Sequence, residues 1–343
     1  MKLCPLAFAL QGLVLFFSCL AEPAAPESRP LPHNFVAPAE RNAAIRYLVA
    51  VTYLTPDMAE KLRAVDWEAL GNTIDPAKLS PEFKAAAALD FSQIILWTAD
   101  GTSMRRCNFE SNYEAGIATL LPQLGQLRQL GRVLRVDARN QLAQGNADLA
   151  AERVAQMLAL GSHVKQDGWL INVLVGTAVQ QQAFEEAIAV AQSPKLGNDA
   201  RARLLAAVES NQGPDPLHLQ QAIVVERDSI VPWLEREAQA PGAWARLKPL
   251  LAEVGSDAEK LNLTDDEVRK QIQQLFPAYD AALVAVRSAT SDEDARKYGL
   301  RVENGEWGTL AAMMLPATPK LRASEKRYRE QMQRAIDALK QSK

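Results

Sequence analysis

Residue types that carry much of enzyme chemistry are scarce in this chain, whose 343 residues include three cysteines, three histidines and only 6% aromatic side chains. His33, His163 and His218 stand alone, and no His-Glu-x-x-His or Cys-x-x-Cys motif occurs. Most zinc sites need such spacings, so we predict no metal site. A glycine-rich phosphate loop and the Gly-x-Ser-x-Gly turn of serine hydrolases are also missing, and we predict no bound cofactor.

An excess of charge of one sign is also missing, because 38 Lys and Arg face 41 Asp and Glu, for a formal net charge of −3. Such a chain has no general attraction for phosphate, so we predict no nucleic-acid partner. Residues 319–343 are the exception, with eight basic residues against three acidic ones. A basic amphipathic helix can lie on anionic lipid, which predicts peripheral membrane contact through 319–343. The alternative is a final helix that packs on the body of the protein with its charges in water.

The N-terminal segment is apolar and has a single charge, Lys2, before an uncharged stretch that continues to Leu20. This pattern predicts a secretory signal peptide over residues 1–21 and therefore export to the periplasm or cell envelope. Residues 22–38 hold five prolines and predict an extended linker. An uncleaved membrane anchor and a lipid anchor at Cys19 are the two alternatives.

Removal of residues 1–21 would leave Cys107 as the one cysteine of the mature chain. A lone cysteine cannot form an internal disulfide, so Cys107 is expected to be buried, free or bonded to another molecule. The fold must then rest on its hydrophobic core.

Residues 39–343 are rich in good helix formers and poor in alternating β-branched runs, which predicts a single all-α domain. We expect an irregular helical bundle or a short α-solenoid of about ten helices, with a subdivision near 193–198 as an option. The Asn304-Gly305 dipeptide allows a small β-hairpin near 300–310. The expected helices lie at about 39–54, 81–97, 120–144, 148–165, 168–184, 199–210, 216–240, 243–254, 265–290 and 319–341.

Several of these helices carry a start signal in which a capping side chain precedes proline. Proline suits the first helical position because its fixed φ fits the helix and no N–H bond is lost there. A Thr-x-x-Glu capping box adds a further start. The signals are Thr55-Pro56, Ser80-Pro81, Asp215-Pro216, Thr318-Pro319 and the box from Thr264 to Glu267.

The turn at Gly145 resembles the inter-helix turn of a tetratricopeptide-like repeat, with small or apolar Ala138, Ala150, Val154 and Met157 at the contact positions. No second copy follows about one repeat length later, whereas an array needs about three repeats. A single helical hairpin in a non-repetitive domain is therefore the alternative.

A wider segment, from Cys107 to Gly145 and loosely through Leu170 to Ala178, resembles uncharacterised exported helical proteins of bacteria. The resemblance covers about a quarter of the chain. It implies an all-helical fold and brings no activity with it.

Ser162 and Lys165 have the Ser-x-x-Lys spacing of serine penicillin-recognising enzymes, in which the lysine can take the serine proton. The partner motifs Ser-Asp-Asn and Lys-Thr-Gly are missing, which favours a chance match. We predict instead a protein- or peptide-interaction or scaffold module. It would use a groove between helices or the face around Cys107, Phe109 and Tyr113.

Two other classes stay open, a hydrolytic enzyme with a non-contiguous site and an envelope-tethered structural lipoprotein. A pocket with several converging titratable groups would favour the enzyme. An exposed apolar groove without such groups would favour the binding protein.

Overall fold

The computed structural model describes residues 41–70, 75–119, 121–253, 257–287, 290–315 and 317–341. The predicted signal peptide, the proline-rich linker, Cys19 and His33 lie outside these ranges. Residues 38–343 form one compact unit. The connection near 193–198, where a subdivision was considered, lies within this unit and is a short turn between two helices.

The all-α prediction is confirmed for the described residues, in which we find no β-strand and a single isolated bridge between Asn42 and Arg106. The N-terminal helices are α2 (Ala43–Thr52), α3 (Pro56–Ala64), α4 (Trp67–Leu70), α5 (Pro81–Ala87), α6 (Ser92–Thr102), α7 (Gln123–Ala143), α8 (Ala147–Lys165) and α9 (Leu170–Ala191). The C-terminal helices are α10 (Asn198–Glu209), α11 (Leu219–Gln239), α12 (Ala243–Glu253), α13 (Asp265–Gln273), α14 (Leu275–Val286), α15 (Asp292–Glu303), α16 (Thr309–Met314) and α17 (Thr318–Lys340). Short 3-10 turns are η2 (Pro76–Lys78), η3 (Tyr113–Ala118) and η4 (Asp257–Lys260). Helices outnumber the expected ten because the expected helices at 81–97 and 265–290 are each split in two, and because α3, α4, α15 and α16 lie outside the expected ranges.

Three of the five predicted helix starts are confirmed. Thr55 and Ser80 each accept a hydrogen bond from a backbone N–H three residues later, and Thr264 forms the capping box. The other two predictions were displaced. Asp215 accepts bonds from the backbone N–H groups of residues 219 and 220, at 2.9 Å each, so α11 begins after Pro216. Thr318 is itself the first residue of α17.

The predicted hairpin near 300–310 was wrong. Asn304 and Gly305 instead end α15, because Gly305 has φ +73° and its N–H bonds to the carbonyl of Val302. The N–H of Glu306 also bonds to the carbonyl of Arg301. This pair of bonds is the Schellman ending of a helix. A glycine with positive φ serves a helix end as well as a hairpin turn, so the dipeptide alone could not distinguish them.

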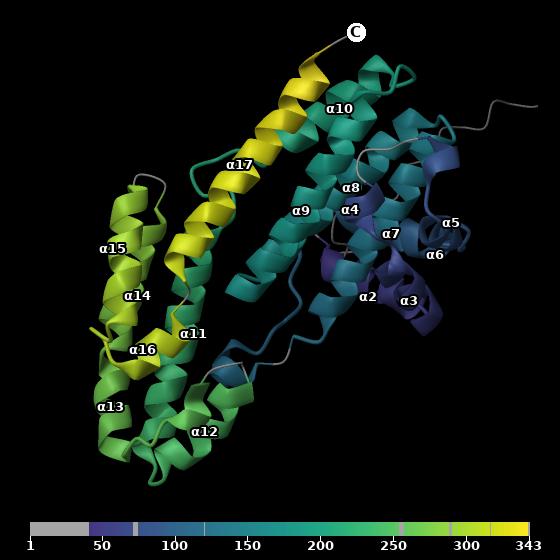
Figure 1. The fold of residues 1–343 in the computed structure, drawn as a ribbon. Helices are drawn as coiled ribbons and strands as arrows, with labels where there is room; N and C mark the ends of the chain where they lie inside the picture. Colours follow the sequence, from purple (N-terminus) through teal and green to yellow (C-terminus); the bar gives the residue numbers. More distant parts are fainter. Residues whose placement is uncertain are drawn as a thin grey trace, which may run out of the picture. The chain divides into compact units, whose positions relative to one another are not determined.

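Helices α7, α8 and α9 pack against one another at the centre of the unit, and α17 runs alongside α9 and α10 (Figure 1). The predicted α7–α8 hairpin is confirmed, with Gly145 at φ +85° in its turn. Helices α8 and α9 approach most closely where Gly161 faces Gly176. A Cβ built on Gly176 would lie 2.4 Å from the Gly161 carbonyl oxygen, so glycine is required there.

Two arginines of helix α7 lie in the core rather than at the surface. The Arg139 guanidinium is fully buried and donates two hydrogen bonds of 2.7 Å to the Glu186 carboxylate. Arg135 donates to the same carboxylate at 2.9 Å. These paired charges connect α7 to α9 inside the core.

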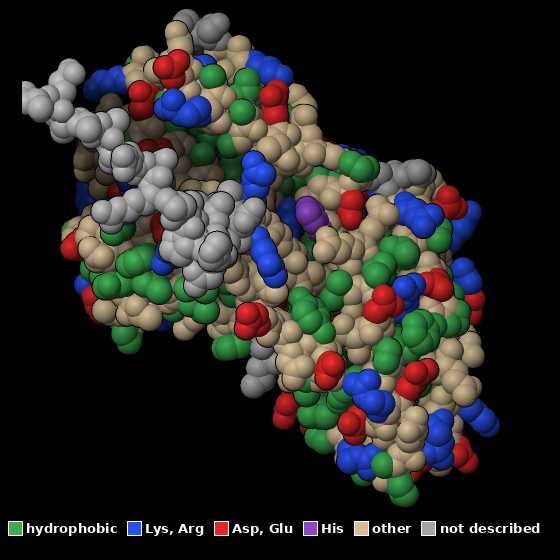
Figure 2. All heavy atoms as spheres, turned by 180° about the vertical axis from the view of Figure 1, so that it is seen from behind, with side chains coloured by type: hydrophobic (Ala, Val, Ile, Leu, Met, Phe, Trp, Pro, Cys, Tyr) green, Lys and Arg blue, Asp and Glu red, His purple; other side chains and the backbone are tan. Residues whose placement is uncertain are grey.

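Helix α17 buries its apolar stripe against α9, α10, α14 and α15. That burial favours the packed final helix, and membrane contact through 319–343 stays a prediction. On the face shown in Figure 2, basic and acidic side chains are intermixed. None of the described helices combines the length and the apolar character that a membrane span needs. The buried members of the stripe are Leu321, Tyr328, Met332, Ala335, Ile336 and Leu339.

Candidate ligand-binding pocket

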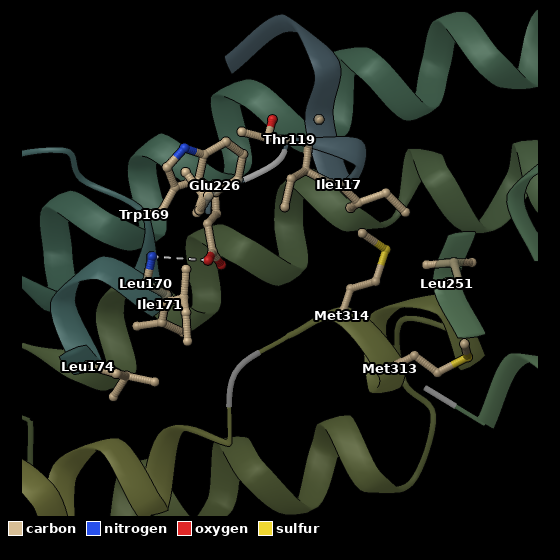
Figure 3. A pocket seen from close by; sticks show the side chains of 13 residues that line it. Ile117, Thr119, Trp169, Leu170, Ile171, Leu174, Glu226, Leu251, Met313 and Met314 are labelled. Atoms are coloured by element: carbon tan, nitrogen blue, oxygen red, sulfur yellow. Dashed lines mark hydrogen bonds between the residues drawn. The ribbon is translucent and has the colours of Figure 1, made fainter. Parts of the chain in front are cut away.

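A pocket of about 460 Å³ lies between the start of α9, the middle of α11, η3 and α16. Its size is in the range of small-ligand sites, and its walls are mostly apolar. Segments far apart in the sequence contribute the walls (Figure 3). The lining residues are Gly116, Ile117, Thr119, Leu121, Trp169, Leu170, Ile171, Leu174, Glu226, Ile230, Leu251, Met313 and Met314.

Two apolar side chains of α9 remain exposed at this pocket. Ile171 and Leu174 are 46% and 40% exposed, respectively. Residues three apart lie on the same face of a helix, so the two side chains form one apolar surface. Most large apolar side chains of α9 are buried in the core, which makes its first turns the exception.

Among the described residues of the lining, Glu226 is the one ionisable side chain. Figure 3 shows its side chain extending from α11 into the pocket, where Oε1 accepts the backbone N–H of Leu170 at 3.2 Å. That N–H belongs to the first turn of α9 and has no acceptor within its own helix. Burial raises the pKa of Glu226 to about 7, and the Leu170 N–H offsets part of that effect. Near neutral pH the carboxyl group is therefore present in both protonation states.

The indole of Trp169 forms one wall and is held from behind by Tyr113. The two rings are stacked, with centroids 5.6 Å apart and planes 4° from parallel. The Tyr113 hydroxyl donates to the carbonyl of Asp167, and the Ser111 hydroxyl donates to the Asp167 carboxylate at 2.6 Å. These bonds fix the segment before α7 to the turn between α8 and α9.

Glycine is required where η3 meets α11. Gly116 has φ +53°, and a Cβ on it would lie 2.4 Å from the indole of Trp233. Any larger residue would push η3 away from α11 and change the shape of the pocket.

The predicted binding residues Cys107, Phe109 and Tyr113 all lie in the connection between α6 and α7. The Cys107 side chain is buried, and its backbone N–H donates to Gln166 Oε1 at 2.8 Å. Burial, and secondarily the charge of Asp167, raises the pKa of the Cys107 thiol to about 12, which makes it a poor nucleophile. Phe109 is half-buried against the core. The pocket lining includes none of the three, although Tyr113 supports it through Trp169, and their binding role stays a prediction.

Sequence reasoning missed the residues that shape this pocket. The helix expected at about 168–184 is mostly buried along its later turns, but Ile171 and Leu174 near its start are exposed. Glu226 follows the apolar run Ala222 to Val225 and precedes Arg227 and Asp228, so its place in the sequence carried no distinctive signal. Nothing in the sequence indicated that α11 would place this carboxyl group beside the start of α9.

The Ser-x-x-Lys spacing does not produce a catalytic pair. The Ser162 hydroxyl donates to the Leu158 carbonyl at 3.1 Å and accepts from Gln180 Nε2 at 2.8 Å. Lys165 Nζ donates to the Pro216 carbonyl at 3.0 Å, and no hydrogen bond between the described Ser162 and Lys165 is present. The lysine therefore has no route to the serine proton, and the match is one of spacing alone.

In the part of the chain that the structure describes, no group of three or more His, Cys, Asp or Glu side chains is arranged to hold a metal ion. Comparison with known proteins gives no match to any family model, curated protein or solved structure. The function must therefore be argued from the pocket itself.

Proposed function

We propose that the protein is a peptide-binding module that holds an apolar segment of a partner polypeptide in the pocket between α9, α11, η3 and α16. The observation that carries this proposal is the exposed apolar pair Ile171 and Leu174 at the opening of a mostly apolar pocket. Removal of such exposed apolar surface from water by a partner lowers the free energy and therefore favours binding.

The composition of the lining favours binding over hydrolysis. A hydrolytic site needs a nucleophile, a base beside it and a group that stabilises the developing charge. The pocket offers one carboxyl group, Glu226, and one hydroxyl group, Thr119, whose proton is donated to the carbonyl of Asn112 at 2.7 Å. Converging titratable groups are therefore lacking among the described lining residues.

The predicted signal peptide over residues 1–21 places this encounter outside the cytoplasm. We propose the periplasm or the cell envelope as the compartment, with an exported protein as the partner. The support for this location is the sequence pattern alone.

Selection from a library of random peptides displayed on phage tests the proposal. The full chain is immobilised beside two variants, Leu174→Arg at the pocket and Leu300→Arg as a matched control. Leu300 is 47% exposed on α15 and is not among the pocket residues, so both changes place the same charge on an exposed leucine.

We expect apolar peptides to be enriched on the wild type and on Leu300→Arg, and to be lost on Leu174→Arg. Arginine at position 174 fills the opening and puts a charge where apolar side chains would be buried. Absence of enrichment on the wild type, or equal enrichment on all three proteins, would contradict the proposed function.

A further inference from the structure

The carboxyl group of Glu226 has an unusual environment, because it is a half-buried acid in a mostly apolar pocket and has no cationic partner among the described residues. No lysine, arginine or histidine is among the described lining residues, and none of the described residues forms an ion pair with Glu226. The one hydrogen bond that it accepts comes from Leu170 and reaches Oε1, so Oε2 is left without a donor among the described residues. A carboxylate that is partly removed from water is stabilised further by a paired cation.

The neighbouring helices do not supply the missing charge. Tyr279 of α14 is the titratable group that faces Glu226, and its hydroxyl is buried without a hydrogen-bond partner among the described residues. Arg227, the next residue of α11, turns away and pairs with Asp228 at 2.8 Å and Asp280 at 2.6 Å. The start of α9 contributes its backbone dipole and no side-chain cation.

The approach to Glu226 suits a long basic side chain. Figure 3 shows Trp169, Leu170 and Ile171 beside the Glu226 side chain, so apolar groups surround the carboxyl group in the pocket. A lysine or arginine stem can pack along apolar walls while its charged end reaches a polar group. The indole of Trp169 adds a ring that attracts cations.

We propose that Glu226 pairs with a basic side chain, lysine or arginine, of the apolar segment that occupies the pocket. This inference rests on the proposed function and names the chemistry of the occupant. The bound cation would satisfy Oε2 and form the charged pair that the free protein lacks.

Such a pair makes binding depend on pH. A cation favours the ionised carboxyl group, so binding lowers the pKa of Glu226 from its free value of about 7 and releases a proton. The ionised fraction of the free protein increases roughly tenfold between pH 6 and pH 8. The affinity for a basic peptide should therefore increase by up to about tenfold over that interval, because the free protein no longer has to lose a proton.

Parallel phage selections at pH 8 on the full chain, Glu226→Gln and Glu235→Gln test the inference. Glutamine at 226 keeps an oxygen that can accept the Leu170 N–H and removes the charge. Glu235 is an exposed acid on the same helix outside the pocket, so its variant controls for loss of one negative charge. A peptide enriched on the wild type is then resynthesised with norleucine in place of its basic residue, which tests the pair even if Glu226→Gln does not fold.

We expect the wild type and Glu235→Gln to enrich apolar peptides with a basic residue, and Glu226→Gln to enrich apolar peptides without one. The norleucine peptide should bind the wild type at least tenfold more weakly at pH 8 and should show no change in affinity from pH 6 to pH 8. Apolar peptides without a preferred basic residue, or equal affinity of the lysine and norleucine peptides, would overturn this inference and leave the proposed function standing. Failure to enrich apolar peptides at all would overturn both.

Discussion

Individual buried charges in this protein are stabilised in two different ways. Arg139 and Glu186 form a closely hydrogen-bonded pair, whose mutual attraction offsets the loss of water. The buried Lys165 and the half-buried Glu226 have no such partner among the described residues. Lys165 donates to a backbone carbonyl and lies over the Tyr328 ring, and Glu226 accepts a backbone N–H. Burial accordingly lowers the pKa of Lys165 to about 7 and raises that of Glu226 to about 7.

Replacement of Lys165 by methionine tests this account of the unpaired lysine. The folded-state pKa lies below the unfolded value, so the unfolded chain binds the extra proton between about pH 7 and pH 10, and wild-type stability should increase with pH in that interval. Lys165→Met should remove this increase and should leave the free energy of unfolding at pH 7 unchanged or raise it by about 1–4 kcal/mol. Urea denaturation at pH 7 and pH 9.5 measures both effects.

The matched control is Lys297→Met, because Lys297 is exposed on α15. This variant should keep the wild-type dependence of stability on pH. A Lys165→Met protein that is less stable than the wild type at pH 7, and that keeps the same pH dependence, would contradict the account.

At the scale of helices, the sequence was most informative where a signal acts within a few residues. The caps at Thr55, Ser80 and Thr264 were predictable because a side chain there bonds to its own backbone. The helix end at Asn304 and Gly305 was not predictable in this way, since Asn-Gly fits both a turn between strands and the end of a helix. The burial of Arg135 and Arg139 could not be predicted from the sequence around them either, because it depends on their pairing with Glu186 of another helix.

The close crossing of α8 and α9 leads to a prediction about Gly176. A Cβ there would lie 2.4 Å from the Gly161 carbonyl oxygen and 2.8 Å from the Lys165 side chain, so Gly176→Ala must force the two helices apart. Overpacking of this kind costs about 1–3 kcal/mol. Urea denaturation of the full chain should show that loss.

Gly125→Ala is the matched control, because a Cβ on this exposed glycine of α7 would have no neighbour within 4 Å. Alanine favours the helix over glycine, so this variant should gain about 0.5–1 kcal/mol. If the two variants change stability equally, the glycine contact does not fix the crossing.

At the scale of the whole molecule, the candidate site is assembled from five separate parts of the chain. The η3 segment with Leu121, the start of α9, the middle of α11, Leu251 of α12 and the end of α16 come together at one pocket. Each part is unremarkable in sequence, since an apolar helix start or a lone glutamate is common in any α-helical protein. For this reason the sequence suggested either a groove between helices, without naming its residues, or the face around Cys107, Phe109 and Tyr113, and did not identify the pocket.

The central claim is that a peptide occupies this pocket, and photo-cross-linking tests it most directly. A selected peptide carrying photo-leucine at its apolar positions is bound to the full chain, irradiated, and mapped by mass spectrometry. The account predicts cross-links to Ile171, Leu174, Met313 and Met314, which an excess of unmodified peptide abolishes. Cross-links confined to the segment around Cys107 and Phe109, or to faces away from the start of α9, would contradict it.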